Sequence, residues 1–133
     1  MSTVRLGRRG DHVGLVTDLL FASSGVEPEI AAAAEDIEVL PGLVLPVATI
    51  GHLIVMKLLA RDDRRRPADA DDLRALVARA SANDWERAGQ AAVQVSERGF
   101  DSDRDLATLL VELRRDGPYR SRCDCRALEH RPE

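Results

Sequence analysis

The segment Ile-Gly-His-Leu-Ile-Val-Met-Lys-Leu-Leu-Ala, residues 50–60, most constrains the fold, because it is apolar on nearly every side of a helix. Thr49 directly before it suits a helix N-cap, and the charged segment 61–67 ends the helix. A helix that is apolar all round is a buried one. We therefore expect the other elements to surround it, in a core of Leu, Val and Ala, since the sequence has only one Trp, one Tyr and two Phe.

Short apolar segments separated by turn residues precede this helix. They predict two antiparallel hairpins, the first closed by a polar Gly-rich loop and the second by Pro41-Gly42, with an alanine-rich helix between them. The expected elements are strands 3–6 and 13–21, a short helix 27–35, and strands 37–40 and 43–47.

Apolar residues at helical spacing follow the central helix. They predict three further helices, from residue 69 or 70 to about 80, from 83 to 97, and from 103 to 115. The fold class is α+β, a small mixed sheet of three or four strands followed by a bundle of about four helices. We expect one domain over 1–116, with the sheet in 1–48 and the helices in 49–116, and a disordered Arg-rich tail over 117–133.

The net charge of -4 excludes a broad basic surface for nucleic acid. No apolar segment is long enough to span a membrane, and the first ten residues lack the apolar core of a secretory signal, so a cytoplasmic location is expected. Cys123 and Cys125 are too few for a four-ligand zinc site and are poorly spaced for a disulfide.

Asp18 interrupts the apolar pattern of the second expected strand, where Asp is disfavoured. With strict alternation it lies on the same side as Val16 and Leu20. A carboxylate at such a position needs a partner. The sequence leaves two hypotheses open, neighbouring backbone N–H groups at a strand end or a role as metal ligand or general base.

Lys57 is the single lysine in a chain with 18 arginines. On the helical wheel it lies between Leu53 and Ile54, so its ammonium group points where the apolar face points. An unpaired buried charge costs several kcal/mol, which means that the side chain reaches past the helix end or that an anion meets it. Arg61 and Arg64 continue the same stripe if the helix runs on, and the three cations suit a carboxylate network or a polyphosphate.

Asp69, Asp71 and Asp72 open the next expected helix, where carboxylates favour the helix dipole. They are also the candidate partners for internal salt bridges with Lys57 and its neighbours. Asp69 and Asp72 share a helix face, so one of them can turn inward while Asp71 faces water. His52 lies 80° or more from Lys57 on the wheel and is interpreted as a core or rim histidine.

Four segments in order resemble bacterial nucleotidyltransferase-like proteins of the AbiEii toxin type (AbiEii/AbiGii), over roughly residues 3 to 113. They are Val-Thr-Asp-Leu-Leu-Phe-Ala-Ser-Ser-Gly-Val-Glu (16–27), Gly-His-Leu-Ile-Val-Met-Lys-Leu-Leu-Ala-Arg (51–61), Arg-Arg-Pro-Ala-Asp-Ala-Asp-Asp-Leu (65–73) and Glu-Arg-Gly-Phe (97–100). The family has a nucleotidyltransferase fold and transfers a nucleoside monophosphate from an NTP with Mg²⁺ held by carboxylates. Some members are toxins that modify tRNA ends.

The resemblance implies site residues by position. Asp18 resembles a metal-binding or base carboxylate, Lys57 the lysine that contacts the triphosphate, and Asp69 the aspartate after it. Arg61 and Arg64 are expected to bind phosphate beside Lys57. The implied cofactor is Mg²⁺, and the implied partners are an NTP and an acceptor such as RNA.

The sequence also departs from the family pattern. The Gly-Ser loop and the Asp-x-Asp pair that precede the first strand in the family are missing before residue 3. One carboxylate cannot hold two Mg²⁺ ions, so we expect no transferase activity from this chain alone, whether another polypeptide supplies the front part or the start codon is misplaced. The alternatives are a non-catalytic interaction module that forms a homodimer or binds a partner through an exposed sheet edge, and a plain helical domain whose Lys57 is salt-bridged without a ligand.

Overall fold

The computed structural model describes residues 3–7, 10, 16–60 and 67–116. It contains four strands and five helices in these ranges, which confirms the α+β class. The order is β1 (Thr3–Gly7), β2 (Val16–Leu20), α1 (Glu27–Ala32), β3 (Glu35–Leu40), β4 (Leu43–Val47), α2 (Ile50–Ala60), α3 (Pro67–Val77), α4 (Ala82–Glu97) and α5 (Leu106–Asp116). The tail over 117–133 lies outside the described residues.

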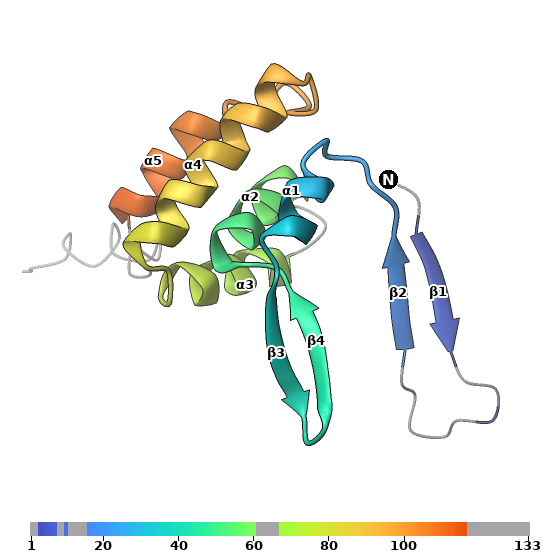
Figure 1. Cartoon of the computed structure of the whole chain (residues 1–133). Coiled ribbons are helices and arrows are strands. Elements are labelled where there is room, and N and C mark those ends of the chain that lie inside the picture. The colour runs from blue at the N-terminus through green and yellow to red at the C-terminus, as the bar shows by residue number, and fades with distance from the viewer. Residues whose placement is uncertain (1–2, 8–9, 11–15, 61–66, 117–133) are drawn as a thin grey trace, which may run out of the picture.

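The strands form two separate two-stranded antiparallel sheets, β1–β2 and β3–β4, and not the one small mixed sheet that the sequence predicts. Each strand pairs only with its neighbour in sequence. The β3–β4 hairpin is closed by the two residues Pro41 and Gly42, and Gly42 supplies the positive φ angle, +79°, that such a tight turn needs. Figure 1 shows both hairpins extending away from the helices. Neither hairpin packs substantially against any other described element.

The hairpins are exposed on both faces. Their apolar side chains, together with Phe21 just after β2, are each 43–62% exposed. They are Val4, Leu6, Val16, Leu19, Leu20, Phe21, Ile37, Val39, Leu40, Leu43, Val44 and Leu45.

Helix α1 is shorter than expected, since it ends at Ala32 and residue Glu35 already belongs to β3. Ala favours a helix, but pairing of Glu35 with Val47 across the hairpin takes precedence over this local preference. Helix α5 likewise begins at Leu106, because Ser102 and Asp103 have positive φ angles of 54° and 61°, outside the right-handed helical region.

The helices make the core, with α2 at its centre (Figure 1). Every residue of α2 from Ile50 to Leu59 is buried or half-buried, as the sequence predicts for a helix that is apolar all round. Helices α3, α4 and α5 each turn one apolar face to the core. None of the described helices is long and apolar enough to cross a membrane.

Gly51 sets how closely α2 and α4 approach. A Cβ atom at this position would overlap the backbone carbonyl oxygen of Asp84 and lie 3.1 Å from the backbone nitrogen of Ala88. Ala88, Ala91 and Ala92 on α4 are buried, so small residues line both sides of this crossing. Backbone atoms cannot move aside as a side chain can, and therefore only glycine fits at residue 51.

The N-terminus of α4 is fixed at the same crossing. Ser81 and Asp84 form a capping box, in which the backbone N–H of Asp84 donates to Ser81 Oγ and the Ser81 N–H donates to the Asp84 carboxylate. Hydrogen bonds from Ser81 outweigh the desolvation of Asp84 and lower its pKa, and the backbone N–H of Gly51 contributes in the same direction. One carboxylate thus serves the starts of two helices.

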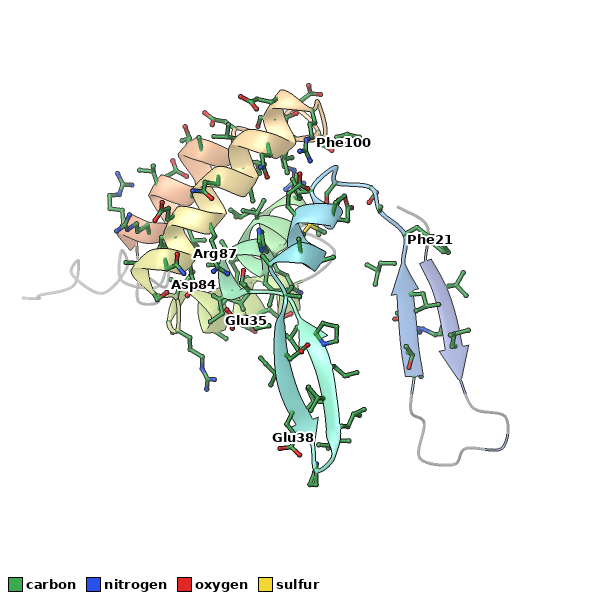
Figure 2. The ribbon with its side chains drawn as sticks, in the orientation of Figure 1. Phe21, Glu35, Glu38, Asp84, Arg87 and Phe100 are labelled. Carbon is green, nitrogen blue, oxygen red and sulfur yellow. The ribbon has the colours of Figure 1, made fainter. Side chains whose placement is uncertain are left out.

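The other end of α4 holds the segment around α1. The Arg98 guanidinium donates to the Gly25 carbonyl oxygen and, at 2.5 Å, to Glu29 Oε1. Gly25 has a φ of +74°, and a Cβ atom there would lie 2.5 Å from Phe100 Cδ2. Figure 2 shows Phe100 at the end of α4 near this segment.

We expect Gly51→Ala to lower the free energy of unfolding by about 3 kcal/mol, because the added methyl group meets backbone atoms on α4. Gly89→Ala on α4 is the matched control. A Cβ atom there meets nothing within 4 Å, so the substitution should stabilise the helix by about 0.5–1 kcal/mol. Urea unfolding followed by circular dichroism measures both, and equal effects would contradict the close crossing.

Candidate functional site

Lys57 is held at the junction of α2 and α3. Its Nζ lies 2.7 Å from Asp72 Oδ2, and the Lys57 and Asp72 side chains are 32% and 57% exposed. The ammonium group is therefore neither deeply buried nor fully solvated. The anion that meets it is Asp72, one of the three aspartates that the sequence offers as partners for an internal salt bridge. Since a lysine ammonium has three N–H donors, it can contact a phosphate oxygen while it remains bound to Asp72.

The other charged residues around Lys57 differ in their placement. Asp71 faces water, as expected, and pairs with Arg74 on the surface of α3. Asp69 is a residue of α3, but its side chain lies outside the described part of the structure. Arg61 and Arg64 also lie outside the described residues, so the predicted three-cation stripe stays a prediction.

Asp18 has a partner that the sequence hypotheses do not include. It faces Arg5 across the β1–β2 ladder, and Arg5 donates to both carboxylate oxygens, with Nε–Oδ1 at 2.7 Å and Nη2–Oδ2 at 2.8 Å. The hydrogen bond from Arg5 lowers the pKa of Asp18. The pair is exposed, which means that its ion pairing adds little to stability.

The structure does not join Asp18 and Lys57 in one constellation. Asp18 belongs to the β1–β2 hairpin, and Lys57 to the helical core. The described residues contain no group of three or more His, Cys, Asp or Glu side chains that could hold a metal ion. Both oxygens of Asp18 are bound to a cation, so this donor set does not fit Mg²⁺.

A pocket of about 440 Å³ lies between α1, α2 and the end of β4, apart from Lys57. Its walls are mostly apolar, with Glu27 and His52 as the polar exceptions. The lining residues are Glu27, Ile30, Ala31, Ala34, Pro46, Ala48, His52, Leu53 and Met56.

The Glu27 carboxylate acts as a structural cap at this pocket. Its Oε1 accepts hydrogen bonds from the backbone N–H groups of Ser23, at 2.5 Å, and Ser24, at 2.7 Å. Desolvation raises the pKa of Glu27, but these hydrogen bonds outweigh it and bring the pKa to about 2. Glu27 is therefore ionised at neutral pH and unsuited to proton transfer there.

His52 is 7% exposed and is a core histidine, as the sequence predicts. Its Nδ1 shares a 2.9 Å hydrogen bond with Thr49 Oγ1 at the start of α2. Desolvation is the main cause of the lowered pKa of His52. The positive charge of Arg87 lowers this pKa further, and the negative charge of Glu29 raises it in part. The imidazole is thus held in its neutral form.

Sequence reasoning missed Arg5 and Arg98, whose contacts bridge residues that are distant in the chain. Arg5 could have been found by aligning the two strands of the expected hairpin, since only one arginine faces Asp18 in the register. Arg98 has no comparable signal, because its contact with Glu29 depends on how α4 packs against α1.

The lowered pKa of His52 predicts that stability falls as the pH drops below about 6.5. In that range the unfolded chain binds a proton that the folded chain excludes, so protonation favours unfolding. His52→Gln should flatten the dependence of unfolding free energy on pH between about 7 and 5, relative to the native chain. Chemical unfolding across this range measures it, and an unchanged slope in His52→Gln would contradict the assignment.

Comparison with known proteins finds no matching family model and no matching curated sequence. The nucleotidyltransferase resemblance therefore stays a prediction from the residues that carry it. To this the structure adds two ion pairs, Lys57 with Asp72 and Asp18 with Arg5.

Proposed function

We propose that this chain is a cytoplasmic, AbiEii-like protein of the nucleotidyltransferase family that binds the phosphates of an NTP through Lys57. The reaction is transfer of a nucleoside monophosphate to an acceptor such as RNA. Lys57 supports this proposal best, because it is the one lysine of the chain and projects from an otherwise apolar helix to a rim where water and Asp72 reach it.

Asp72 has a specific part in this proposal. Its carboxylate orients the Lys57 ammonium group from α3 and so reduces the entropy that phosphate binding would otherwise cost. The same carboxylate also repels an incoming triphosphate, and Asp71 beside it in the chain adds to the negative charge at this end of α3. Binding by this chain alone should accordingly be weak, and it should strengthen when a divalent cation accompanies the nucleotide.

Catalysis would need carboxylates beyond those described, because the residues around Asp18 do not fit Mg²⁺. We propose that a further polypeptide segment supplies them. This chain would then contribute the helical core and the phosphate-binding lysine, and no transfer step is assigned to its own residues.

Calorimetric titration with Mg-ATP and Mg-CTP tests the phosphate contact. We expect Lys57→Met to weaken binding about tenfold, the effect of losing one charge-assisted contact of about 1.4 kcal/mol. Arg74→Met is the matched control, since it also removes one exposed cation from a pair with an aspartate, on the outer side of α3. It should leave the affinity nearly unchanged.

Two results of that titration would contradict the proposal. The first is a native chain that binds neither nucleotide, and the second is an equal loss of affinity in both variants, which would indicate a general effect of charge. Thermal unfolding of each variant separates loss of contact from loss of fold.

We further expect that the purified chain, supplied with Mg²⁺, labelled NTP and RNA, incorporates no nucleotide. The physical reason is the missing set of metal-binding carboxylates among its described residues. Incorporation that disappears in Asp18→Asn would overturn this expectation and would assign Asp18 a catalytic part.

The exposed hairpins favour a second candidate, a non-catalytic interaction module. Two-stranded hairpins with apolar side chains on both faces are suited to binding another polypeptide. This candidate requires no nucleotide, so the titration above distinguishes it from the first.

A further inference from the structure

The β1–β2 and β3–β4 hairpins expose apolar surface that nothing in the described part of the chain covers. Twelve large apolar side chains, on the strands and at Phe21, are each 43–62% exposed. On β1–β2, the cross-strand pair Val4 and Leu19 lies on one face with Leu6, and on β3–β4, Ile37 is paired with Leu45. Figure 2 shows Phe21 and Glu38 on these hairpins, away from the helices.

An isolated two-stranded hairpin is marginally stable in water, and stability generally needs a third strand or a packed face. Single exposed apolar residues are common, but contiguous patches above a few hundred Å² mark interaction sites. The twelve half-exposed side chains of the two hairpins expose apolar surface on the order of 1,000 Å², divided between both faces of each hairpin. A standard interface buries roughly 800 Å² of each partner, so this surface is of the size that an interface between chains uses.

Two features decide which strand edges can pair. Pro46 in β4 has no N–H to donate, so β4 is a poor edge for a further strand. Strand β3 carries Glu35, Asp36 and Glu38, while β3 and β4 together contain no basic residue. Pairing of β3 with a second β3 would therefore place like charges opposite each other, which is destabilising.

Strand β1 is the complementary edge. Arg5 is the one charged residue on it, with a side chain that is 72% exposed, whereas β2 carries Asp18 and would repel an acidic neighbour. Pairing of β1 with β1 would oppose two arginines. Among the described strands, the charges thus favour β1 beside β3 over the like-charge combinations.

We infer that two copies of this chain form a dimer in which β1 of each copy pairs with β3 of the other copy. Each exchange joins two hairpins into a four-stranded sheet in the order β2-β1-β3-β4. The two exchanges are related by a two-fold axis, so the assembly closes at two copies. This inference deepens the interaction-module candidate and rests on it, and it requires nothing of Lys57.

Sedimentation or light scattering across micromolar concentrations tests the assembly. The native chain should have twice its 14.6 kDa mass. Leu6→Asp on β1 and Ile37→Asp on β3 should each weaken dimerisation more than tenfold. Both apolar side chains are exposed in the single chain and lie on the strands that pair, and each substitution adds a negative charge beside the acidic residues of β3. Val111→Asp on α5 is the control, a 66% exposed apolar residue outside the hairpins, and should leave the mass unchanged.

Mixing the two variants tests the exchange itself. A Leu6→Asp chain with an Ile37→Asp chain retains one native β1–β3 interface, so the mixture should dimerise more strongly than either variant alone. The double variant, with both changes in one chain, has no native β1–β3 interface, so it should dimerise no more strongly than either single variant. Circular dichroism confirms that the helical core is intact in each protein.

A native chain that stays monomeric overturns the inference, as does a mixture with no recovery, or an Ile37→Asp chain that remains dimeric. None of these outcomes affects nucleotide binding at Lys57. Failure of nucleotide binding, in turn, leaves the predicted mass unchanged, so the two proposals fail separately.

Discussion

The crossing of α2 and α4 at Gly51 is the constraint on which the rest of the fold depends. A glycine here, opposite the buried alanines of α4, lets two helix backbones come close enough that Asp84 serves both helix starts. Close approach compensates for a core with few aromatics, since small side chains gain dispersion contacts only when backbones are near. Helices α3 and α5 then pack on the remaining faces of this pair.

The placement of Lys57 follows from this arrangement. Because α4 and α5 cover other sides of α2, the lysine reaches the boundary with α3, where Asp72 accepts its hydrogen bond. The hairpins have no comparable support from the core, and their cross-strand contacts, including Arg5 with Asp18, stand outside it. The described part of the chain thus combines a packed helical body with two hairpins whose apolar side chains are exposed.

Much of the fold could be predicted from residue patterns. The strand pairs follow from alternating apolar segments around turn residues, and the core faces of α4 and α5 follow from the spacing of Ala88, Val95, Leu106 and Leu110. The ends of the elements were harder to predict, because helix and strand preferences compete there. Glu35, for example, enters a strand instead of extending an alanine-rich helix. The anomaly of Lys57 was visible in the sequence, which also offered three aspartates as its partners. That Asp72 is the one bound depended on how α2 and α3 pack together.

The sequence by itself determined the elements, the buried central helix and the residues that violate its pattern, because hydrophobic periodicity and turn chemistry act over a few neighbouring residues. Only the tertiary structure decided that the two hairpins stay separate instead of joining in one sheet, that Arg98 ties α4 to Gly25 and Glu29, and which of the candidate aspartates meets Lys57. These outcomes join residues far apart in the chain. They depend on the relative positions of whole elements, which packing sets and local sequence does not.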